Sequence, residues 1–225
     1  MRFVLVRPRN PLNVGAAARA LANFGFSDLV AVLPHAPVWK EAKSAVGAEA
    51  LLARAPALSL EEALGDRHVA LGTHDGRRRG GPPVIELPAL RAWLAERLAA
   101  GGRLALCFGP EKTGLGNDVL SRCHAAIRIP TTPACPSMNL AQAVAVVAYE
   151  LARTSEEAKA SFTYIAMTDR QREAFVAQAV ALCRKAGWRP HDPDEVLARK
   201  FRDLLLRRPL SRDEAATLQA LLRRL

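Results

Sequence analysis

The chain has 225 residues, half of them hydrophobic, which suits one large domain with a small appendage. Its formal net charge of +10 indicates an anionic partner such as nucleic acid, unless the charge is simply an exposed basic face. Four cysteines without a C-x-x-C pair argue against a metal site, and no apolar run is long enough for a membrane span, so we expect a cytoplasmic protein.

Short apolar runs alternate with helical patterns through the first two thirds of the chain. The runs have the length and composition of buried strands, and apolar residues recur at helical spacing between them. Strands are expected at 3–6, 29–33, 68–71, 104–108 and 126–129. Helices are expected at 13–24, 40–53, 90–100 and 140–151. This alternation predicts an α/β fold, a mostly parallel sheet with helices on both faces.

Beyond residue 155 only helical patterns remain. The composition turns polar and small from about residue 154 to 163, which predicts a linker at 156–168. Residues 169–225 are expected to form a helical extension. Capping boxes open its first and last helices, at Thr168 and Ser211. Its apolar stripes include Leu197, Phe201, Leu204 and Leu205, then Leu218, Leu221 and Leu222. The extension holds 13 Lys and Arg against 8 Asp and Glu, a net charge of +5, and is therefore basic.

The first helical segment, NVGAAARA, holds one cation among small residues. Asn13 is most simply a helix cap, and Gly15 lets a ligand or another element approach closely. Arg19 can serve a ligand, or its stem can lie along the surface with the charge in water.

A glycine-rich loop, GPEKTGLG, begins at Gly109 after the fourth strand. It is not a P-loop, because Leu115 and Gly116 stand where Lys and Ser or Thr are required. Loops at this end of a parallel strand commonly form the ligand crevice, so Glu111 is a candidate functional carboxylate.

Two further segments carry polar groups. The loop HDGRRRGGPP after the third strand holds three arginines that can grip phosphates or simply remain solvated. The turn PSMNLAQAV sets Ser137 and Asn139 at the start of an apolar helix. Ser and Asn are favoured caps, and the free N–H groups of a first turn also suit ligand binding.

In order, these segments resemble the three motifs of the SPOUT-class RNA ribose 2′-O-methyltransferases. NVGAAARALANFG is similar to the first motif, ALCFGPEKTGLGNDVLSRCHAAIRIP to the second and PSMNLAQAVAVVAYEL to the third. They cover the expected catalytic domain, residues 1–155, nearly end to end. The basic tail is similar to the extension of members that methylate the anticodon loop of tRNA.

The resemblance implies a C-terminal trefoil knot, S-adenosylmethionine (AdoMet) as cofactor and a homodimer. It implies methylation of a ribose 2′-hydroxyl in tRNA, at nucleotide 32. The same reaction on ribosomal RNA and a catalytically silent RNA-binding protein remain alternatives. The residues that it places around the cofactor are Thr73, His74, Asp75, Gly109, Leu115, Ile129, Pro136, Ser137, Met138 and Leu140.

The catalytic residues that the resemblance implies are Arg19, Asn13, Glu111, Ser137 and Asn139. A guanidinium is a poor base because it stays protonated at neutral pH. We therefore expect Arg19 to act with an RNA phosphate on the developing alkoxide, while the other four orient the reactants. The arginines expected to contact RNA are Arg7, Arg19, Arg77, Arg78 and Arg79. Pro136 and Met138 replace the Ser and Leu frequent in related tRNA enzymes, which bears on nucleoside preference.

Overall fold

The computed structural model describes residues 1–34, 42–74, 81–98, 101–153, 167–207 and 210–222. Within them, seven strands form one sheet in the order β3-β2-β1-β6-β4-β7-β5, and every pair of neighbours is parallel. The strands are β1 (Arg2–Val6), β2 (Asp28–Val32), β3 (Ala57–Leu58), β4 (Val69–Thr73), β5 (Val84–Glu86), β6 (Leu104–Phe108) and β7 (Ala125–Arg128). The five predicted runs are thus confirmed as strands. The sequence missed β3 and β5, which are too short to show a pattern.

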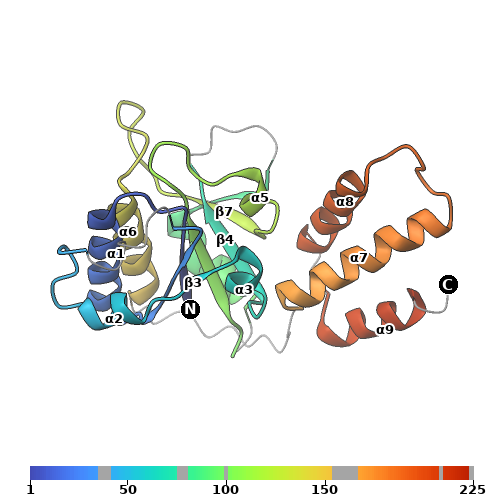
Figure 1. Ribbon diagram of the computed structural model, residues 1–225, viewed down its shortest axis with the longest axis horizontal. Helices are drawn as coiled ribbons and strands as arrows, with labels where there is room; N and C mark the ends of the chain where they lie inside the picture. The colour runs from blue at the N-terminus through green and yellow to red at the C-terminus, as the bar shows by residue number, and fades with distance from the viewer. Residues whose placement is uncertain (35–41, 75–80, 99–100, 154–166, 208–209, 223–225) are drawn as a thin grey trace.

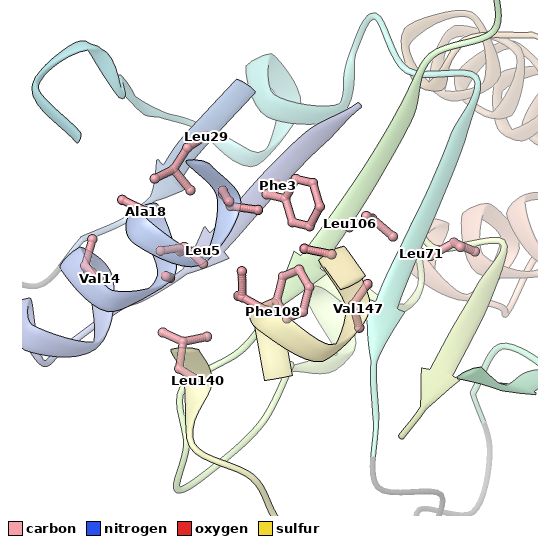
Figure 2. Close-up of a cluster of buried hydrophobic side chains, with 14 of the residues drawn as sticks. Phe3, Leu5, Val14, Ala18, Leu29, Leu71, Leu106, Phe108, Leu140 and Val147 are labelled. Carbon is pink, nitrogen blue, oxygen red and sulfur yellow. The ribbon is translucent and has the colours of Figure 1, made fainter. Parts of the chain in front are cut away.

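Helices cover both faces of the sheet, as predicted (Figure 1). On β1, Phe3 and Leu5 join one buried cluster, whereas Val4 and Val6 join another on the opposite face. Successive side chains of a strand point to opposite faces, so a strand buried on both faces reads as one continuous apolar run. Figure 2 shows the first cluster, in which the rings of Phe3 and Phe108 stack 6.0 Å apart.

Four helices contribute to the first cluster, on one face of the sheet, and two short helices contribute to the second, on the other face. The first cluster includes residues of α1 (Pro11–Asn23), α2 (Glu49–Arg54), α4 (Leu90–Ala95) and α6 (Leu140–Ala152). The second includes residues of α3 (Leu60–Leu64) and α5 (Asn117–Leu120). The helix predicted at 40–53 is wrong over residues 42–48, because Gly47 takes a φ of +79° in a turn and α2 begins only at Glu49. The helix predicted at 90–100 is also shorter, and a 3-10 turn, η2 (Leu87–Ala89), precedes it.

Three further helices, α7 (Asp169–Lys185), α8 (Asp194–Arg207) and α9 (Arg212–Leu222), lie together to the right of the sheet in Figure 1. The capping boxes at Thr168 and Ser211 are confirmed. The predicted stripes are partly wrong, because Leu204, Leu218 and Leu221 are 57%, 39% and 55% exposed, while the small Ala215 is buried. Residues 156–166 of the predicted linker lie outside the described residues, and the domain boundary at 155 stays a prediction.

The first turn of α7 is anchored to the sheet domain by buried charges. Asp169 is fully buried and accepts hydrogen bonds from Arg122 and from Arg172, the latter at 2.7 Å. The backbone N–H of Asp169 donates to the carbonyl of Arg67 at 2.8 Å. Arg172 also lies 3.3 Å from Nε2 of the buried His124. This network fixes where the extension starts relative to the sheet.

Two expectations about the whole fold have different outcomes. No described helix is long and apolar enough to cross a membrane. The trefoil knot implied by the resemblance stays a prediction.

Candidate functional site

Three neighbouring strands, β6, β4 and β7, end at the same edge of the sheet. The chain order reverses beside them, since β2 and β3 lie to one side of β1 and the remaining strands to the other. In parallel α/β sheets such a reversal opens a crevice at the carboxyl ends of the strands. A pocket of about 670 Å³ lies there, between the three strand ends, the loops that follow β6 and β7, and the first turn of α6.

Most residues expected around a cofactor line this pocket. Leu115 and Leu140 are buried in its wall, beside Ile129 and the partly exposed Met138. The expected residues that line it are Thr73, His74, Gly109, Leu115, Ile129, Pro136, Ser137, Met138 and Leu140. Asp75 lies outside the described residues. The structure therefore brings these positions together, and their role in binding stays a prediction.

The glycine-rich loop after β6 is a tight turn. The N–H of Gly114 donates to the carbonyl of Pro110 at 2.8 Å, and Gly114 takes a φ of +62°, which favours glycine. A Cβ added to Gly109 would lie 2.4 Å from the carbonyl carbon of Gly114. Both glycines are therefore needed for the turn, which presents Glu111 and its two successors to the pocket.

The loop after β7 folds back on itself before α6 begins. The hydroxyl of Thr131 donates to the carbonyl of Pro136 at 3.0 Å, and the N–H of Cys135 donates to the carbonyl of Thr132 at 3.1 Å. Residues 136–138 are thereby turned towards the pocket. Asn139, and not Ser137, caps α6, because its Oδ1 accepts from the N–H of Ala141 at 2.9 Å.

Three of the expected catalytic residues form one hydrogen-bonded chain. Nδ2 of Asn139 donates to Oδ1 of Asn13 at 3.0 Å, and Nδ2 of Asn13 donates to Oε1 of Glu111. The interpretation of Asn13 as a helix cap is wrong, because α1 begins at Pro11 and Asn10 is its cap. Asn13 instead stands in the first turn of α1 with its side chain free to join the other two motifs.

The two expected arginines that the structure describes, Arg7 and Arg19, are not part of this hydrogen-bonded network. Arg19 is exposed on α1 and does not line the pocket. Arg7, directly after β1, is half-exposed and forms an ion pair at 2.8 Å with Asp118 of α5. Residues 77–79 lie outside the described residues. An RNA contact by any of these arginines stays a prediction.

Several lining residues were not singled out from the sequence. Lys112 and Thr113 lie within the glycine-rich motif, so the motif itself was a signal for them. Thr131 gave no signal, because its role is to close a loop whose shape the sequence does not specify. The further lining residues are Phe108, Pro110, Gly114, Ile127 and Ala143.

Known proteins are similar to this chain in both sequence and fold. Residues 1–149 match the model of the SpoU rRNA Methylase family. The tRNA (cytidine/uridine/adenosine-2′-O-)-methyltransferase TrmJ of Pseudomonas aeruginosa is 41% identical over 153 residues, which are 67% of this chain and 60% of that protein. The chain thus spans less than two thirds of the length of this relative.

The similarity to one solved structure extends over the helical tail as well. The crystal structure of TrmJ from Z. mobilis ZM4 matches with a TM-score of 0.84 at 29% identity, covering 99% of this chain and 97% of that one. The SpoU methyltransferase AviRb of Streptomyces viridochromogenes, in complex with AdoMet, matches with a TM-score of 0.52 at 22% identity. This second match covers 68% of this chain and 57% of AviRb, and supports a shared fold.

Proposed function

The chain belongs to the SpoU rRNA methylase family, and we propose that it transfers a methyl group from AdoMet to a ribose 2′-hydroxyl of tRNA. The observation that carries the proposal is the chain of Asn139, Asn13 and Glu111 beside the pocket. Three segments far apart in sequence meet there at the switch point of the sheet. A protein that only bound RNA would not need this arrangement.

The pocket fits AdoMet in size and in the character of its walls. Its volume of about 670 Å³ is within the usual range for a ligand of this size. Leu115, Ile129 and Leu140 offer apolar contacts for an adenine ring, and the turn at Gly109 brings the backbone close. When bound, the cofactor supplies an electrophilic methyl group on a positively charged sulfur.

The residues around the pocket would orient the ribose and assist the loss of its proton. A 2′-hydroxyl is a weak nucleophile until its proton leaves, so negative charge that develops on the oxygen must be stabilised. Asn139 and Asn13 hold the Glu111 carboxylate in one direction, and Ser137 adds a hydroxyl at the pocket. Arg19, acting with an RNA phosphate, would stabilise the developing alkoxide.

We also propose a homodimer that forms through the outer face of α1 and α6. These helices pack on each other, and Leu12 and Tyr149 are 57% and 54% exposed. Arg19 lies on the same exposed side of α1 as Leu12, seven residues and about two helical turns further along. Because Arg19 does not line the pocket of its own chain, pairing offers it a route to the partner's pocket. Light scattering of the purified protein tests the dimer.

The finer features of the proposal follow the resemblance. They are nucleotide 32 of the anticodon loop as the target, the trefoil knot around the third motif, and RNA contacts by Arg7, by residues 77–79 and by the basic helices beyond the boundary at 155. The name of the P. aeruginosa relative supports tRNA over ribosomal RNA.

The proposal is tested by labelled methyl transfer from AdoMet to total small RNA, followed by mapping of the modified nucleotide. We expect label in tRNA, on a ribose of the anticodon loop. Label only in ribosomal RNA would overturn the tRNA assignment. Absence of measurable AdoMet binding by calorimetry would favour a silent RNA-binding protein.

A further inference from the structure

Lys112 places a positive charge at the pocket. It is exposed, and it is the one lysine or arginine among the described residues that line the pocket. Within the described part of the chain, no carboxylate lies within ion-pair distance of its ammonium group. The carboxylate next to it in sequence, Glu111, is already bonded to Asn13. The ammonium of Lys112 is therefore available to an anion that enters from solvent.

The backbone around Lys112 is held in one shape. The bond from Gly114 to Pro110 closes the turn, and the space beside Gly109 is too small for a side chain. The turn thus presents a carboxylate, an ammonium and a hydroxyl on three consecutive residues, Glu111, Lys112 and Thr113, all of which line the pocket. A fixed backbone reduces the entropy lost when such a group binds its partner.

We propose that Lys112 binds the RNA phosphate on the 3′ side of the ribose that is methylated. The inference rests on the proposed function. The 2′-oxygen and the 3′-phosphate are attached to adjacent carbons of the ribose, so a 2′-oxygen brought to the pocket brings a phosphate with it. The ammonium would hold that phosphate and offset its repulsion of the negative charge that develops on the 2′-oxygen. Lys112 is thus a positioning residue for the RNA.

The other anion that could reach Lys112 is the carboxylate of AdoMet itself. Lys112 is exposed to solvent, whereas Leu115 and Leu140 in the apolar wall of the pocket are buried. The lysine is therefore accessible to RNA, which remains outside the pocket except for the reacting nucleotide. The two anions are distinguished by measuring cofactor and RNA binding separately.

The test compares Lys112→Gln and Lys112→Arg with Lys43→Gln, which removes the same charge from an exposed lysine that does not line the pocket. For Lys112→Gln we expect an unchanged Kd for AdoMet. Its kcat/KM for tRNA should be reduced by a factor of up to about ten. The slope of log Kd for tRNA against log salt should become shallower by about one unit. Lys112→Arg should restore most of the activity, and Lys43→Gln should leave kcat/KM near that of the wild type.

A Lys112→Gln protein with wild-type kcat/KM and salt slope would overturn the inference. A weaker Kd for AdoMet would overturn it too, because the lysine would then bind the cofactor's carboxylate. If the wild-type protein methylates no RNA, the proposed function fails by itself. The salt slope of RNA binding still tests Lys112 in that case, since it needs no turnover.

A modified substrate isolates the phosphate itself. After the methylated nucleotide is mapped, an oligonucleotide with an uncharged methylphosphonate on its 3′ side is compared with the unmodified one. The wild type should lose about as much kcat/KM with this substrate as Lys112→Gln loses with the ordinary one. For Lys112→Gln, replacing the ordinary substrate by the methylphosphonate should reduce kcat/KM little further, because the contact is already lost. If the reduction for the variant with the modified substrate equals the product of the two single reductions, the contact is overturned.

Discussion

Asn139 donates from Nδ2 to Oδ1 of Asn13 over 3.0 Å, although 126 residues separate the two in sequence. The oxygen of the same amide caps α6 through the N–H of Ala141. The nitrogen of Asn13 donates in turn to Glu111. Asn13 cannot reverse its amide without turning its oxygen towards that carboxylate, so the direction of both bonds is set. Asn139 therefore caps α6 and, through Asn13, also connects the third motif to the first and second.

Asn139→Asp and Asn139→Ala separate these two roles. Asp caps a helix as well as Asn does, but it loses the donor to Asn13, whereas Ala loses both functions. We expect Asn139→Ala to lower the free energy of unfolding by about 0.5–2 kcal/mol more than Asn139→Asp, and both to lose most turnover. Chemical denaturation and methyl transfer check this.

The matched control for the cap is Ser59→Ala. It removes the capping box of α3, which belongs to the opposite face of the sheet. Stability should fall by an amount similar to that from the loss of the α6 cap, with turnover unchanged. Full activity of Asn139→Asp would show that the bond to Asn13 is dispensable.

Gly109→Ala should weaken cofactor binding. The added Cβ would lie 2.4–2.7 Å from backbone atoms of Gly114 and Leu115, which cannot move aside without opening the turn. We expect a Kd for AdoMet at least tenfold higher by calorimetry, and a loss of about 1–3 kcal/mol of stability from overpacking. Gly81→Ala is the control, because its Cβ would meet nothing within 4 Å. Equal AdoMet affinities of the two variants would count against this pocket as the cofactor site.

Arg19→Ala should separate cofactor binding from catalysis. Arg19 does not line the pocket, so the Kd for AdoMet should stay near that of the wild type. Turnover should fall about a hundredfold or more, the usual effect of losing a group that stabilises developing charge. Arg19→Lys keeps the charge but loses the planar fork, and should recover only part of the rate. Methylation near the wild-type rate by Arg19→Ala would rule out the role.

Local rules predicted the sheet well, because parallel strands buried on both faces leave continuous apolar runs in the sequence. They assigned Asn13 wrongly although a signal was present: Pro11 is favoured at the first helical position, which makes Asn10 the cap. The bonds from Asn13 to Glu111 and Asn139 could not be predicted from spacing. These bonds depend on the order of the strands in the sheet, which decides which strand ends, and therefore which loops, are neighbours.

The helical tail shows the opposite limit. Its starts were predicted, because a capping box is a contact within four residues of sequence. Its buried face was predicted less well, since periodicity gives a stripe but not what covers it. Leu218 and Leu221 share the α9 stripe and are exposed, while Ala215 is buried.

As the pH is lowered below about 6.5, the ordinary pKa of histidine, the free energy of unfolding should decrease. Burial, and next the charge of Arg172, lower the pKa of His124 well below that value. As the pH falls, the unfolded chain therefore takes up a proton that the native state does not, so stability is lost, at up to about 1.4 kcal/mol per pH unit. The pKa of His68 is lowered too and acts in the same direction. Urea denaturation between pH 7.5 and 5 measures the slope.

His124→Asn is the matched variant for this pH dependence. Nδ1 of His124 accepts from the N–H of Ala70 at 3.1 Å, and an amide oxygen can replace that acceptor without taking up a proton. The slope between pH 6.5 and 5 should be shallower in this variant. An unchanged slope would assign the effect to other groups.

Asp169→Asn should loosen the junction between α7 and the sheet. The substitution removes the carboxylate charge from between Arg122 and Arg172 and leaves a buried guanidinium without its counter-charge. Breaking a buried ion pair from one side commonly costs about 3–5 kcal/mol. We expect a loss of that order in denaturation, together with faster hydrogen exchange in the first turn of α7. AdoMet binding should persist, because every described residue of the pocket precedes α7.

Asp192→Asn makes the same chemical change at an exposed site, where Asp192 pairs with Arg189 and Lys200. Exposed pairs contribute little because water and salt screen them, so this control should be far less destabilising. If Asp169→Asn is as mild as Asp192→Asn, the buried network does not hold the extension in place. If Asp169→Asn keeps its AdoMet affinity but loses affinity for tRNA, the fixed position of the basic helices is itself part of substrate recognition.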